Sequence, residues 1–369
     1  MKSITLLTAS ALALLSGTVL AVSGPAAAGA AVTAGAVYTM SNAPSDNAVI
    51  VYDRLGSGQL LPAGSFSTGG TGTGGGLGNQ GAVTLTTEQE FLLVVNPGSN
   101  DISVFRVRES GLTLVDRVPS GGLQPVSVTE HSGLVFVLNA GSDDITGFSM
   151  SGGGKLTARP AARRSLSSTG TGPAQIGFSP DGDVLVVTEK ATNRIVTFTL
   201  SAFGIPNSRK VFESAGVTPF GFAFAERRHL VVSEAVGGAP GASSASSYQV
   251  SRSGGVAPLS EEVATTQTAA CWIAITPDGR YALTTNTGSS TISRYSVAFG
   301  GQLSLEQAAA GVTGSRPIDM AFSGDGRYVY TLNAGDQTIS AFGVGPDGDL
   351  SAVETVTGLP VGSNGLAVR

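Results

Sequence analysis

One unit of about 25 residues recurs along this chain, and it limits the possible folds more than any other feature. The segment IAITPDGRYALTTNTGSSTISRYSV at residues 273–297 returns as MAFSGDGRYVYTLNAGDQTISAFGV at residues 320–344. A degraded copy, IGFSPDGDVLVVTEKATNRIVTFTL, occupies residues 176–200, and weaker copies begin near Val83, Val126 and Phe222. Internal similarity of this kind indicates several copies of one supersecondary unit packed side by side.

Each copy is predicted to contain four strands. A short apolar strand ends at a turn such as TPDG or SGDG, and the second strand alternates as in RYVYTLN. A loop then leads to a third strand, and a glycine turn leads to a weaker fourth strand such as DGDLSAVETV. Proline and Asp-Gly suit tight turns, and period-two alternation of β-branched and aromatic residues is typical of strands. The low charge content of 13% and the 52 glycines fit many short strands joined by tight turns.

The second strand of each unit ends at one recurring place, which we call the strand-end position. Consecutive members lie 43 to 54 residues apart, and they are Asn42, Asn96, Asn139, Glu189, Glu234, Asn286 and Asn333. Seven four-stranded units at this spacing predict an all-β, seven-bladed β-propeller with antiparallel blades. The first unit lacks its own first strand, while the final segment GSNGLAVR resembles an orphan first strand. We therefore expect the C-terminal strand to complete the first blade and close the ring.

The N-terminus has the pattern of a secretory signal peptide. One lysine precedes an apolar run at residues 4–22, and small residues follow at positions 26–28. A retained membrane anchor is the alternative, because the apolar run is long enough to span a bilayer. We expect a signal peptide at residues 1–31, one propeller domain at residues 32–369, and a secreted protein, extracellular or periplasmic, without membrane contact after cleavage.

Charge and residue counts exclude several classes of function. A net charge of −5 and a pI near 5.1 leave no basic stripe for nucleic acid. The single cysteine, Cys271, lies between small and apolar residues and is predicted to be a buried small hydrophobe rather than a nucleophile. The only histidines, His131 and His229, are predicted to lie in turns, and no zinc or serine-hydrolase motif is present. We expect a monomer without a cofactor, although oxygen ligands leave a divalent ion such as Ca²⁺ open.

The segment STGGTGTGGGLGNQ, residues 67–80, is an insertion between the first two units, and we call it the glycine-rich segment. It contains G-x-G-x-x-G at Gly70, Gly72 and Gly75. No strand-to-helix unit surrounds this motif, so it does not indicate a dinucleotide site. We expect a flexible or tightly turned loop between two blades.

Antiparallel blades place the loops between second and third strands on the same face as the crossovers between blades. Residues at the start of each first strand surround the channel mouth on that face, where a concave site with converging polar groups would bind a small ligand. Asparagines at the strand-end position face the same region, although such residues also serve their own turns and tolerate left-handed backbone. The predicted substrate-binding residues are Gln124, Gln175, Phe220, Trp272, Arg316, Asn139, Asn286 and Asn333.

Glu189 and Glu234 interrupt the asparagine pattern in adjacent blades. A carboxylate cannot donate a hydrogen bond to the loop as an amide does. Either these two loops are built differently or the carboxylates serve the channel. Lys190 and Arg194 offer a salt-bridge explanation for Glu189, whereas Glu234 has no cation near it in the sequence. We predict both glutamates as candidate catalytic residues.

The repeats quoted above, together with GPAQIGFSPDGDVLVVTEKATN at residues 172–193, resemble the seven-bladed propeller lactonases. That family includes the propeller type of 6-phosphogluconolactonase and the carboxymuconate lactonizing enzyme. The resemblance implies a glutamate at the end of the second strand of one blade, a place that both Glu189 and Glu234 match. It also implies histidine and arginine early in first strands, where this chain has basic character only at Arg316. That departure favours a neutral small-molecule ligand.

Three functions follow from these observations. The first is an enzyme that hydrolyses a lactone or similar cyclic ester, with a glutamate activating water at the channel mouth. The second is a secreted binding propeller without catalysis. The third is a muconate-type cycloisomerase, which the scarcity of basic residues disfavours.

Overall fold

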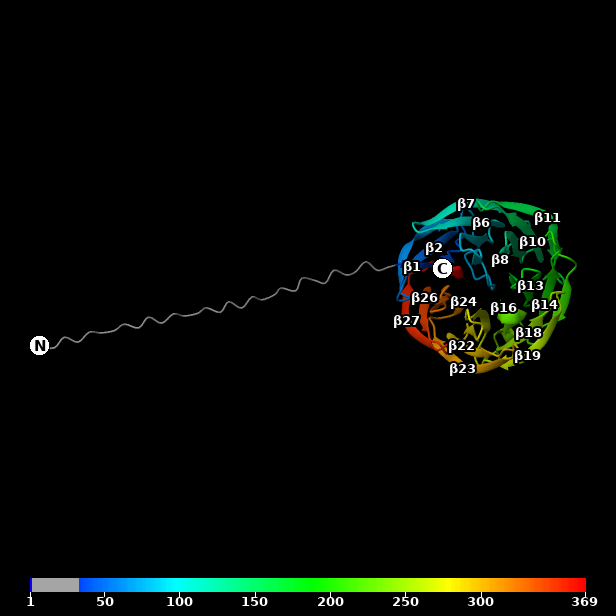
Figure 1. The fold of residues 1–369 in the computed structure, drawn as a ribbon. Helices are drawn as coiled ribbons and strands as arrows, with labels where there is room; N and C mark the ends of the chain where they lie inside the picture. The colour runs from blue at the N-terminus through cyan, green and yellow to red at the C-terminus, as the bar shows by residue number, and fades with distance from the viewer. Residues whose placement is uncertain (2–32) are drawn as a thin grey trace. The chain divides into compact units, whose positions relative to one another are not determined.

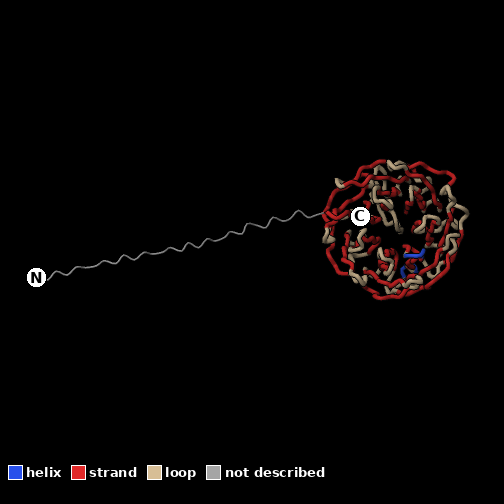
Figure 2. Tube along the Cα trace, in the orientation of Figure 1, coloured by secondary structure: helices blue, strands red, loops and turns tan. Residues whose placement is uncertain are grey.

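The protein is described by a computed structural model that covers Met1 and residues 33–369. Residues Thr33–Arg369 form seven four-stranded antiparallel sheets arranged as blades around a central channel, as the ring of strands in Figures 1 and 2 shows. The predicted all-β, seven-bladed propeller is confirmed. The predicted signal peptide lies outside the described residues, apart from Met1, so the leader and the boundary at residue 32 stay predictions.

Each blade contributes one strand to each of four layers, counted outward from the channel. The inner strands are β28 (Asn364–Val368), β4 (Val83–Leu85), β8 (Pro125–His131), β12 (Pro173–Phe178), β16 (Pro219–Phe224), β20 (Ala270–Ile275) and β24 (Pro317–Phe322). The second strands are β1 (Thr33–Met40), β5 (Phe91–Asn96), β9 (Leu134–Asn139), β13 (Val184–Glu189), β17 (His229–Glu234), β21 (Tyr281–Asn286) and β25 (Tyr328–Asn333). The third strands are β2 (Ala48–Leu55), β6 (Asp101–Arg108), β10 (Asp144–Met150), β14 (Arg194–Thr199), β18 (Ser244–Val250), β22 (Thr291–Val297) and β26 (Thr338–Val344). The outer strands are β3 (Leu60–Ser67), β7 (Gly111–Pro119), β11 (Leu156–Ser165), β15 (Lys210–Glu213), β19 (Val256–Ala264), β23 (Leu303–Val312) and β27 (Leu350–Thr357).

The ring closes where the two ends of the described chain meet in blade 1. The C-terminal strand β28 pairs antiparallel with β1, with Val37 opposite Val368 and Met40 opposite Asn364. This pairing confirms the predicted closure, and it supplies hydrogen-bond partners that a free inner-strand edge would otherwise lack. Blades 2 to 7 follow in chain order from β4 to β27.

The hydrophobic core lies between neighbouring blades. The second strands β5, β13 and β17 are buried at every residue, because each is covered on both faces by the adjacent blades. Val186 of β13, for example, belongs to one apolar cluster with Phe222 and Val232 of blade 5. Outer strands such as β27 alternate between exposed and partly buried residues, as expected for strands with one wet face.

The strand-end position differs from the expectation in its backbone. Its members from blade 2 onward end their strands in extended pairing, and the left-handed residue of the loop comes four positions later. These left-handed residues are Asn100, Asp143, Asn193, Gly238, Ser290 and Gln337, whereas in blade 1 Asn42 is itself left-handed, with φ of 51°. The left-handed conformation expected at the strand-end position is therefore found at Asn42, and in blades 2 to 7 it falls on a later residue.

The glycine-rich segment connects blade 1 to blade 2, as predicted, but it does not remain outside the ring. Its last residues enter the channel, where Gln80 N–H donates to Ala174 O of blade 4 at 3.0 Å. Trp272 of blade 6 donates its indole N–H to Asn79 O at 2.7 Å. The predicted loop between two blades is therefore confirmed, and it also bonds to inner strands across the ring, which composition did not indicate.

Blade 5 also carries the two short 3₁₀ turns, η1 (Glu226–Arg228) and η2 (Val236–Gly238). None of the helical elements in residues 33–369 has the length and apolar character that crossing a bilayer would require.

Candidate functional site

Glu189 ends β13 with 0% of its surface exposed. Its carboxylate accepts hydrogen bonds from Ser167 N–H at 2.9 Å and from Thr192 Oγ1 at 2.6 Å, and the Ser167 hydroxyl also donates to it. Ser167 belongs to the crossover that enters blade 4. The carboxylate therefore ties this crossover to β13, and the ion pairs of the described chain place neither Lys190 nor Arg194 against it.

Glu234 occupies the equivalent place in blade 5 and is also 0% exposed. It accepts hydrogen bonds from Gly216 N–H at 2.9 Å and from Ser244 Oγ at 2.5 Å. A Cβ atom on Gly216 would lie 2.3 Å from the carboxyl carbon, so only glycine allows this approach. Burial raises the pKa of Glu234, although hydrogen bonds from Ser244, Ser246 and the Gly216 N–H oppose that shift.

Both glutamates thus accept from the crossover that leads into their own blade, whereas Asn139, Asn286 and Asn333 donate to side chains of the third strand. The two loops are built differently, which is one of the explanations that the sequence left open. The expectation that these carboxylates face the channel mouth is not met, because both are enclosed. Their predicted catalytic role is not tested by these contacts and stays a prediction.

The predicted binding asparagines are enclosed in the same way. Each is 0% exposed, and its amide donates to side chains five and seven residues further on. The pairs are Asn139 with Asp144 and Thr146, Asn286 with Thr291 and Ser293, and Asn333 with Thr338 and Ser340, at 2.8 to 3.2 Å. These bonds fasten the second strand to the third, so the asparagines do not line the mouth as expected.

Gln175 lies in β12 with its side chain bonded to the next inner strand. Its Nε2 donates to Phe222 O at 3.0 Å, and its Oε1 accepts from Phe222 N–H at 2.7 Å. Other inner strands use the equivalent position similarly, since Ser127 Oγ accepts from Ile176 N–H at 3.2 Å. The reason is general: the channel-facing edge of an inner strand has backbone groups without a neighbouring strand, and these require partners.

Gly221 occupies this position in blade 5 and has no side chain to offer. The side chain of Gln80, from the glycine-rich segment, bonds the next inner strand instead. Its Nε2 donates to Ile273 O at 2.9 Å, and its Oε1 accepts from Ile273 N–H at 3.3 Å. A Cβ atom on Gly221 would lie 2.1 Å from Gln80 Oε1. Gln80 therefore supplies the hydrogen-bond partner for the inner strand of blade 6 that a side chain at position 221 would otherwise supply.

Phe220 and Trp272, which the sequence placed together at the channel mouth, are in contact in the structure. Their rings lie 4.9 Å apart between centroids, and both side chains are buried. Lys190, from the loop after β13, places its ammonium 4.8 Å from the centre of the Phe220 ring. Burial lowers the pKa of Lys190 to about 8, and burial raises the pKa of the nearby Cys271 thiol to about 11. Cys271 is buried, which confirms the sequence prediction.

Gln124 and Arg316 are exposed and precede the inner strands of blades 3 and 7. Both have left-handed backbone, with φ of 52° and 54°. The Gln124 N–H donates to Asn100 Oδ1 of the preceding blade at 2.6 Å. The two side chains belong to different parts of the ring and do not form one cluster with the aromatic pair.

A cavity of about 340 Å³ lies at the opposite end of the channel, where inner strands run into their first turns. We call it the turn-end cavity. Its wall includes Gln175 with the rings of Phe178 and Phe222, and its rim includes Glu130 and His131 at the end of β8. Aromatic walls with a few polar groups are typical of small-molecule sites.

His131 is a titratable group of this cavity, beside Glu130, that sequence reasoning missed. It is the last residue of β8 rather than a turn residue, and its ring is partly exposed. The imidazole packs against Phe178 with 5.5 Å between ring centroids. A Cβ atom on Gly182 would lie 2.2 Å from the imidazole, so the glycine of the blade 4 turn makes room for it. The sequence signal for this residue was the pair Glu130-His131 at the end of a largely apolar strand.

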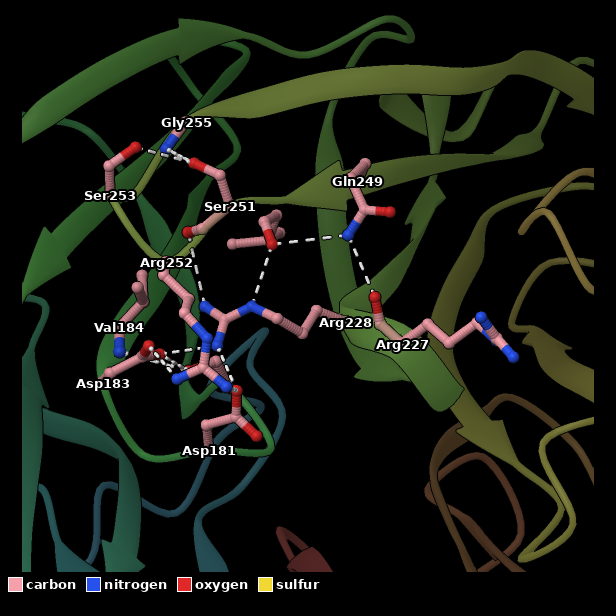
Figure 3. A network of polar contacts seen from close by, with 12 residues as sticks. Asp181, Asp183, Val184, Arg227, Arg228, Gln249, Ser251, Arg252, Ser253 and Gly255 are labelled. Atoms are coloured by element: carbon pink, nitrogen blue, oxygen red, sulfur yellow. Dashed lines mark hydrogen bonds and ion pairs between the residues drawn. The ribbon is translucent and has the colours of Figure 1, made fainter.

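An ion-pair network fixes the blade 4 turn at the rim of this cavity (Figure 3). Arg228 from η1 pairs with Asp181 at 2.9 Å and with Asp183 at 2.7 Å, and its Nε donates to Val250 O at 2.9 Å. Its side chain is only 11% exposed, while the flanking Arg252 is 73% exposed. Burial alone would raise the pKa of Asp183, but hydrogen bonds from Arg228 and Ser179 hold it below its usual value.

Asp319 of β24 is a second residue that sequence reasoning missed. It holds the place in blade 7 that Gln175 holds in blade 4, and it is 2% exposed. One carboxylate oxygen accepts from Met320 N–H at 2.8 Å, and the other accepts from Leu366 N–H of β28 at 3.0 Å. Burial raises the pKa of Asp319 to about 8 despite these bonds. The sequence signal for this residue was an acidic side chain within the otherwise apolar strand PIDMAF.

Residues 33–369 bring no group of three or more histidine, cysteine, aspartate or glutamate side chains together in a way that suits a metal ion. A divalent-metal requirement therefore stays an open prediction.

The fold and channel define a seven-bladed propeller with a polar and aromatic cavity inside the ring. The sequence profile of the family described as "Lactonase, 7-bladed beta-propeller" matches residues 35–164 and 242–364. The chain belongs to this family, as the repeat had suggested. A comparison with curated protein sequences finds no match.

Solved structures show the same fold. A putative 6-phosphogluconolactonase from Bacteroides fragilis is 17% identical with a TM-score of 0.70, covering 91% of this chain and 98% of its own. The periplasmic gluconolactonase PpgL from Pseudomonas aeruginosa is 17% identical with a TM-score of 0.71, covering 90% of this chain and 99% of its own. A Lactobacillus plantarum protein reaches a TM-score of 0.74 at 15% identity, covering 92% of this chain and 100% of its own.

Proposed function

We propose that the protein hydrolyses a lactone or similar cyclic ester in the turn-end cavity. The observation that carries this proposal is the position of His131, an imidazole on the rim of an aromatic-walled cavity inside a lactonase-family propeller. Ester hydrolysis needs a base that removes a proton from water, and histidine serves that role most often near neutral pH.

The chemistry can be written with this chain's residues alone. His131 takes a proton from a water molecule as the water oxygen attacks the lactone carbonyl carbon. The bond between that carbon and the ring oxygen then breaks, and the imidazolium returns its proton to the leaving oxygen. The product is one open-chain hydroxy acid. Phe178 and Phe222 would hold the apolar part of the ring and limit access of bulk water.

Gln175 keeps its predicted substrate-binding role in this proposal. Its amide is fixed by two hydrogen bonds to Phe222, yet Oε1 has a second lone pair and Nε2 a second hydrogen. This lone pair and this hydrogen border the cavity and would orient a polar group of the substrate. Because the amide is already held in place, little side-chain entropy would be lost on binding.

Glu189 and Glu234 are the alternative bases. Their enclosed carboxylates, each held by hydrogen bonds from neighbouring residues, favour a structural role, because a general base must reach water and substrate. Turnover that depends on these glutamates would instead support the site predicted from the sequence.

A pH-stat screen against γ- and δ-lactones tests the proposal. We expect turnover by the parent protein and a loss of 10²-fold or more in kcat for His131→Gln, since general-base catalysis typically contributes roughly 10²–10⁴-fold. His229→Gln changes the chain's other histidine, outside the cavity, and serves as the control. The variant with both Glu189→Gln and Glu234→Gln should keep its turnover.

The outcomes separate the candidate functions. Activity that survives His131→Gln but disappears in the double glutamate variant would move the reaction to the glutamates. A parent protein that turns over no lactone would support the binding propeller without catalysis. Isomerised rather than hydrolysed product, read by NMR, would support a cycloisomerase.

We also propose that the protein acts outside the cytoplasm as a monomer on a neutral ligand. The leader-like sequence at residues 1–31 supports export, and one structural neighbour is described as periplasmic. Cell fractionation with N-terminal sequencing tests export, since an uncleaved cytoplasmic protein would contradict it. Size-exclusion chromatography with light scattering tests the monomer.

A further inference from the structure

The turn between β12 and β13 of blade 4 has a different charge pattern from the equivalent turns of blades 6 and 7. Those two turns read TPDGR and SGDGR, and each pairs its aspartate with its own arginine. Asp278 lies 2.7 Å from Arg280, and Asp325 lies 4.0 Å from Arg327. Blade 4 reads SPDGD, so an aspartate replaces the arginine and two carboxylates flank Gly182. Neighbouring carboxylates repel one another unless a cation lies close to both.

Blade 5 supplies that cation from a strained stretch of backbone. Arg228 of η1 pairs with both aspartates, as Figure 3 shows, and its side chain is only 11% exposed. Its backbone is left-handed with φ of 65°, and Arg227 before it has φ of 56°. Such a backbone is strained for a residue with a side chain, and it persists where surrounding contacts hold it, often at functional sites. The strain indicates that Arg228 is required at this place.

The turn that Arg228 holds lies against the imidazole of His131. A Cβ atom on Gly182 would lie 2.2 Å from that ring, so the backbone of the turn approaches it directly. Phe178, at the end of β12, supplies a second contact with 5.5 Å between ring centroids. Both contacts come from blade 4. The imidazole of blade 3 is therefore held by a blade 4 turn, and that turn is held in its place by blade 5.

Turn glycines of other blades make the same kind of contact with the blade before them. A Cβ atom on Gly326 would lie 2.9 Å from Pro277 of blade 6, and one on Gly279 would lie 3.1 Å from Glu226 of blade 5. Among these three turns, that of blade 4 is the one whose glycine contacts a side chain on the rim of the turn-end cavity. The repeat thus supplies a general contact between blades, and blade 4 applies it to His131.

We propose that Arg228 is a positioning residue for the reaction in the turn-end cavity: through the two aspartates and Gly182, it fixes the orientation of the His131 imidazole. This inference rests on the proposed hydrolysis. Arg228 is not part of the cavity wall, so it acts through the turn and not on the substrate. A general base must keep its nitrogen within hydrogen-bond reach of the attacking water, and a misplacement of about 1 Å can lower a rate by about 10²-fold.

The orientation of the imidazole can be measured without any substrate. The chain has two histidines, so untagged protein with isotope-labelled histidine gives two imidazole Cε1–H signals in NMR, and His131→Gln assigns one of them. The Phe178 ring displaces the His131 signal while the imidazole is held against it. In Arg228→Ala this signal should move toward its position in urea. Arg252→Ala removes the 73% exposed arginine of the same network, and this matched control should leave the signal in place.

Kinetics with a lactone that the parent turns over provide a second readout. We expect kcat of Arg228→Ala to fall about 10-fold and KM to stay within about 3-fold, because a misplaced base slows proton transfer and leaves the aromatic walls intact. Arg252→Ala should keep the parent values. Arg228→Lys keeps a cation beside the aspartates but lacks the planar fork, so it should show the same changes at smaller size. This variant carries the test if Arg228→Ala fails to fold, as circular dichroism would show.

The outcomes separate this inference from the proposed hydrolysis. A His131 signal and a kcat that stay at parent values in folded Arg228→Ala would overturn the positioning role, as would equal losses in Arg252→Ala. A rise in KM at unchanged kcat would also overturn it, because Arg228 would then serve substrate binding. A parent protein that turns over no lactone would contradict the hydrolysis, and the His131 signal would still decide whether Arg228 fixes the imidazole.

Discussion

Replacing Asp319 by asparagine should remove a strong pH dependence from the stability of the propeller. This carboxyl group lies between blade 7 and the closing strand β28, bonded to Met320 N–H and Leu366 N–H. No cation pairs with it among the described residues, so burial dominates and raises its pKa from 3.8 to about 8. The acid thus sits at the junction that closes the ring.

The sign of the effect follows from proton linkage. Between pH 3.8 and 8 the folded state binds this proton more tightly than the unfolded chain does. The free energy of unfolding therefore falls as pH rises, by up to about 1.4 kcal/mol per pH unit, and levels off above the folded pKa. The full difference between the unfolded and folded pKa values would correspond to about 6 kcal/mol. Relaxation of the site should reduce the measured loss of unfolding free energy to roughly 2–4 kcal/mol.

Urea unfolding followed by Trp272 fluorescence at pH 5, 6, 7, 8 and 9 measures this loss. The difference in free energy of unfolding between the parent and Asp319→Asn should change steadily up to about pH 8 and then level off. Asparagine also places an N–H group against a backbone N–H, which lowers the variant's stability at every pH without altering that trend. Exposed Asp347→Asn is the control. Parallel parent and Asp319→Asn curves would contradict a raised pKa for Asp319.

Three further substitutions test other parts of the structure. Gly221→Ala places a Cβ atom 2.1 Å from Gln80 Oε1 and should cost about 1–3 kcal/mol in urea unfolding, whereas Gly75→Ala, with no atom within 4 Å, should cost much less. Glu234→Gln removes a buried acid of raised pKa, so its stability relative to the parent should improve as pH rises from 5 to 8, and a constant difference would contradict that. Arg228→Ala leaves two aspartates without their buried partner and should cost about 2–4 kcal/mol, while exposed Arg252→Ala should cost under about 1 kcal/mol by the same assay.

The fold was predictable because the repeat specifies each blade locally. Turn residues such as Pro-Asp-Gly and alternating strands recur at a regular spacing, and the orphan strand after Gly362 identified how the ring closes. These are short-range signals, so one sequence was enough to count the blades and order their strands.

The candidate site was less predictable because it depends on contacts between distant blades. A repeat shows that Glu189 and Glu234 replace asparagine, but not that Ser167 and Gly216 present N–H groups to them. Carboxylates and amides at one position looked like functional variation. In the structure the glutamates accept from the crossover into their own blade, and the asparagines of blades 2, 3, 6 and 7 donate to the third strand.

The glycine-rich segment is the clearest case of this limit. Composition predicted a loop, and a loop was found, but its path across the channel depends on the empty position at Gly221 and on Trp272. Those residues lie 141 and 192 positions beyond Gln80, as the numbering gives directly. No local pattern connects them.

A crystal structure with a bound δ-lactam would show directly where a cyclic ester binds, because this amide analogue of a cyclic ester resists hydrolysis. We expect the lactam in the turn-end cavity, with its carbonyl within reach of a water molecule that is hydrogen-bonded to His131. A lactam bound beside Glu189 or Glu234 would contradict the proposed place of hydrolysis. A lactam that stays outside the channel at saturating concentration would contradict the proposed function itself.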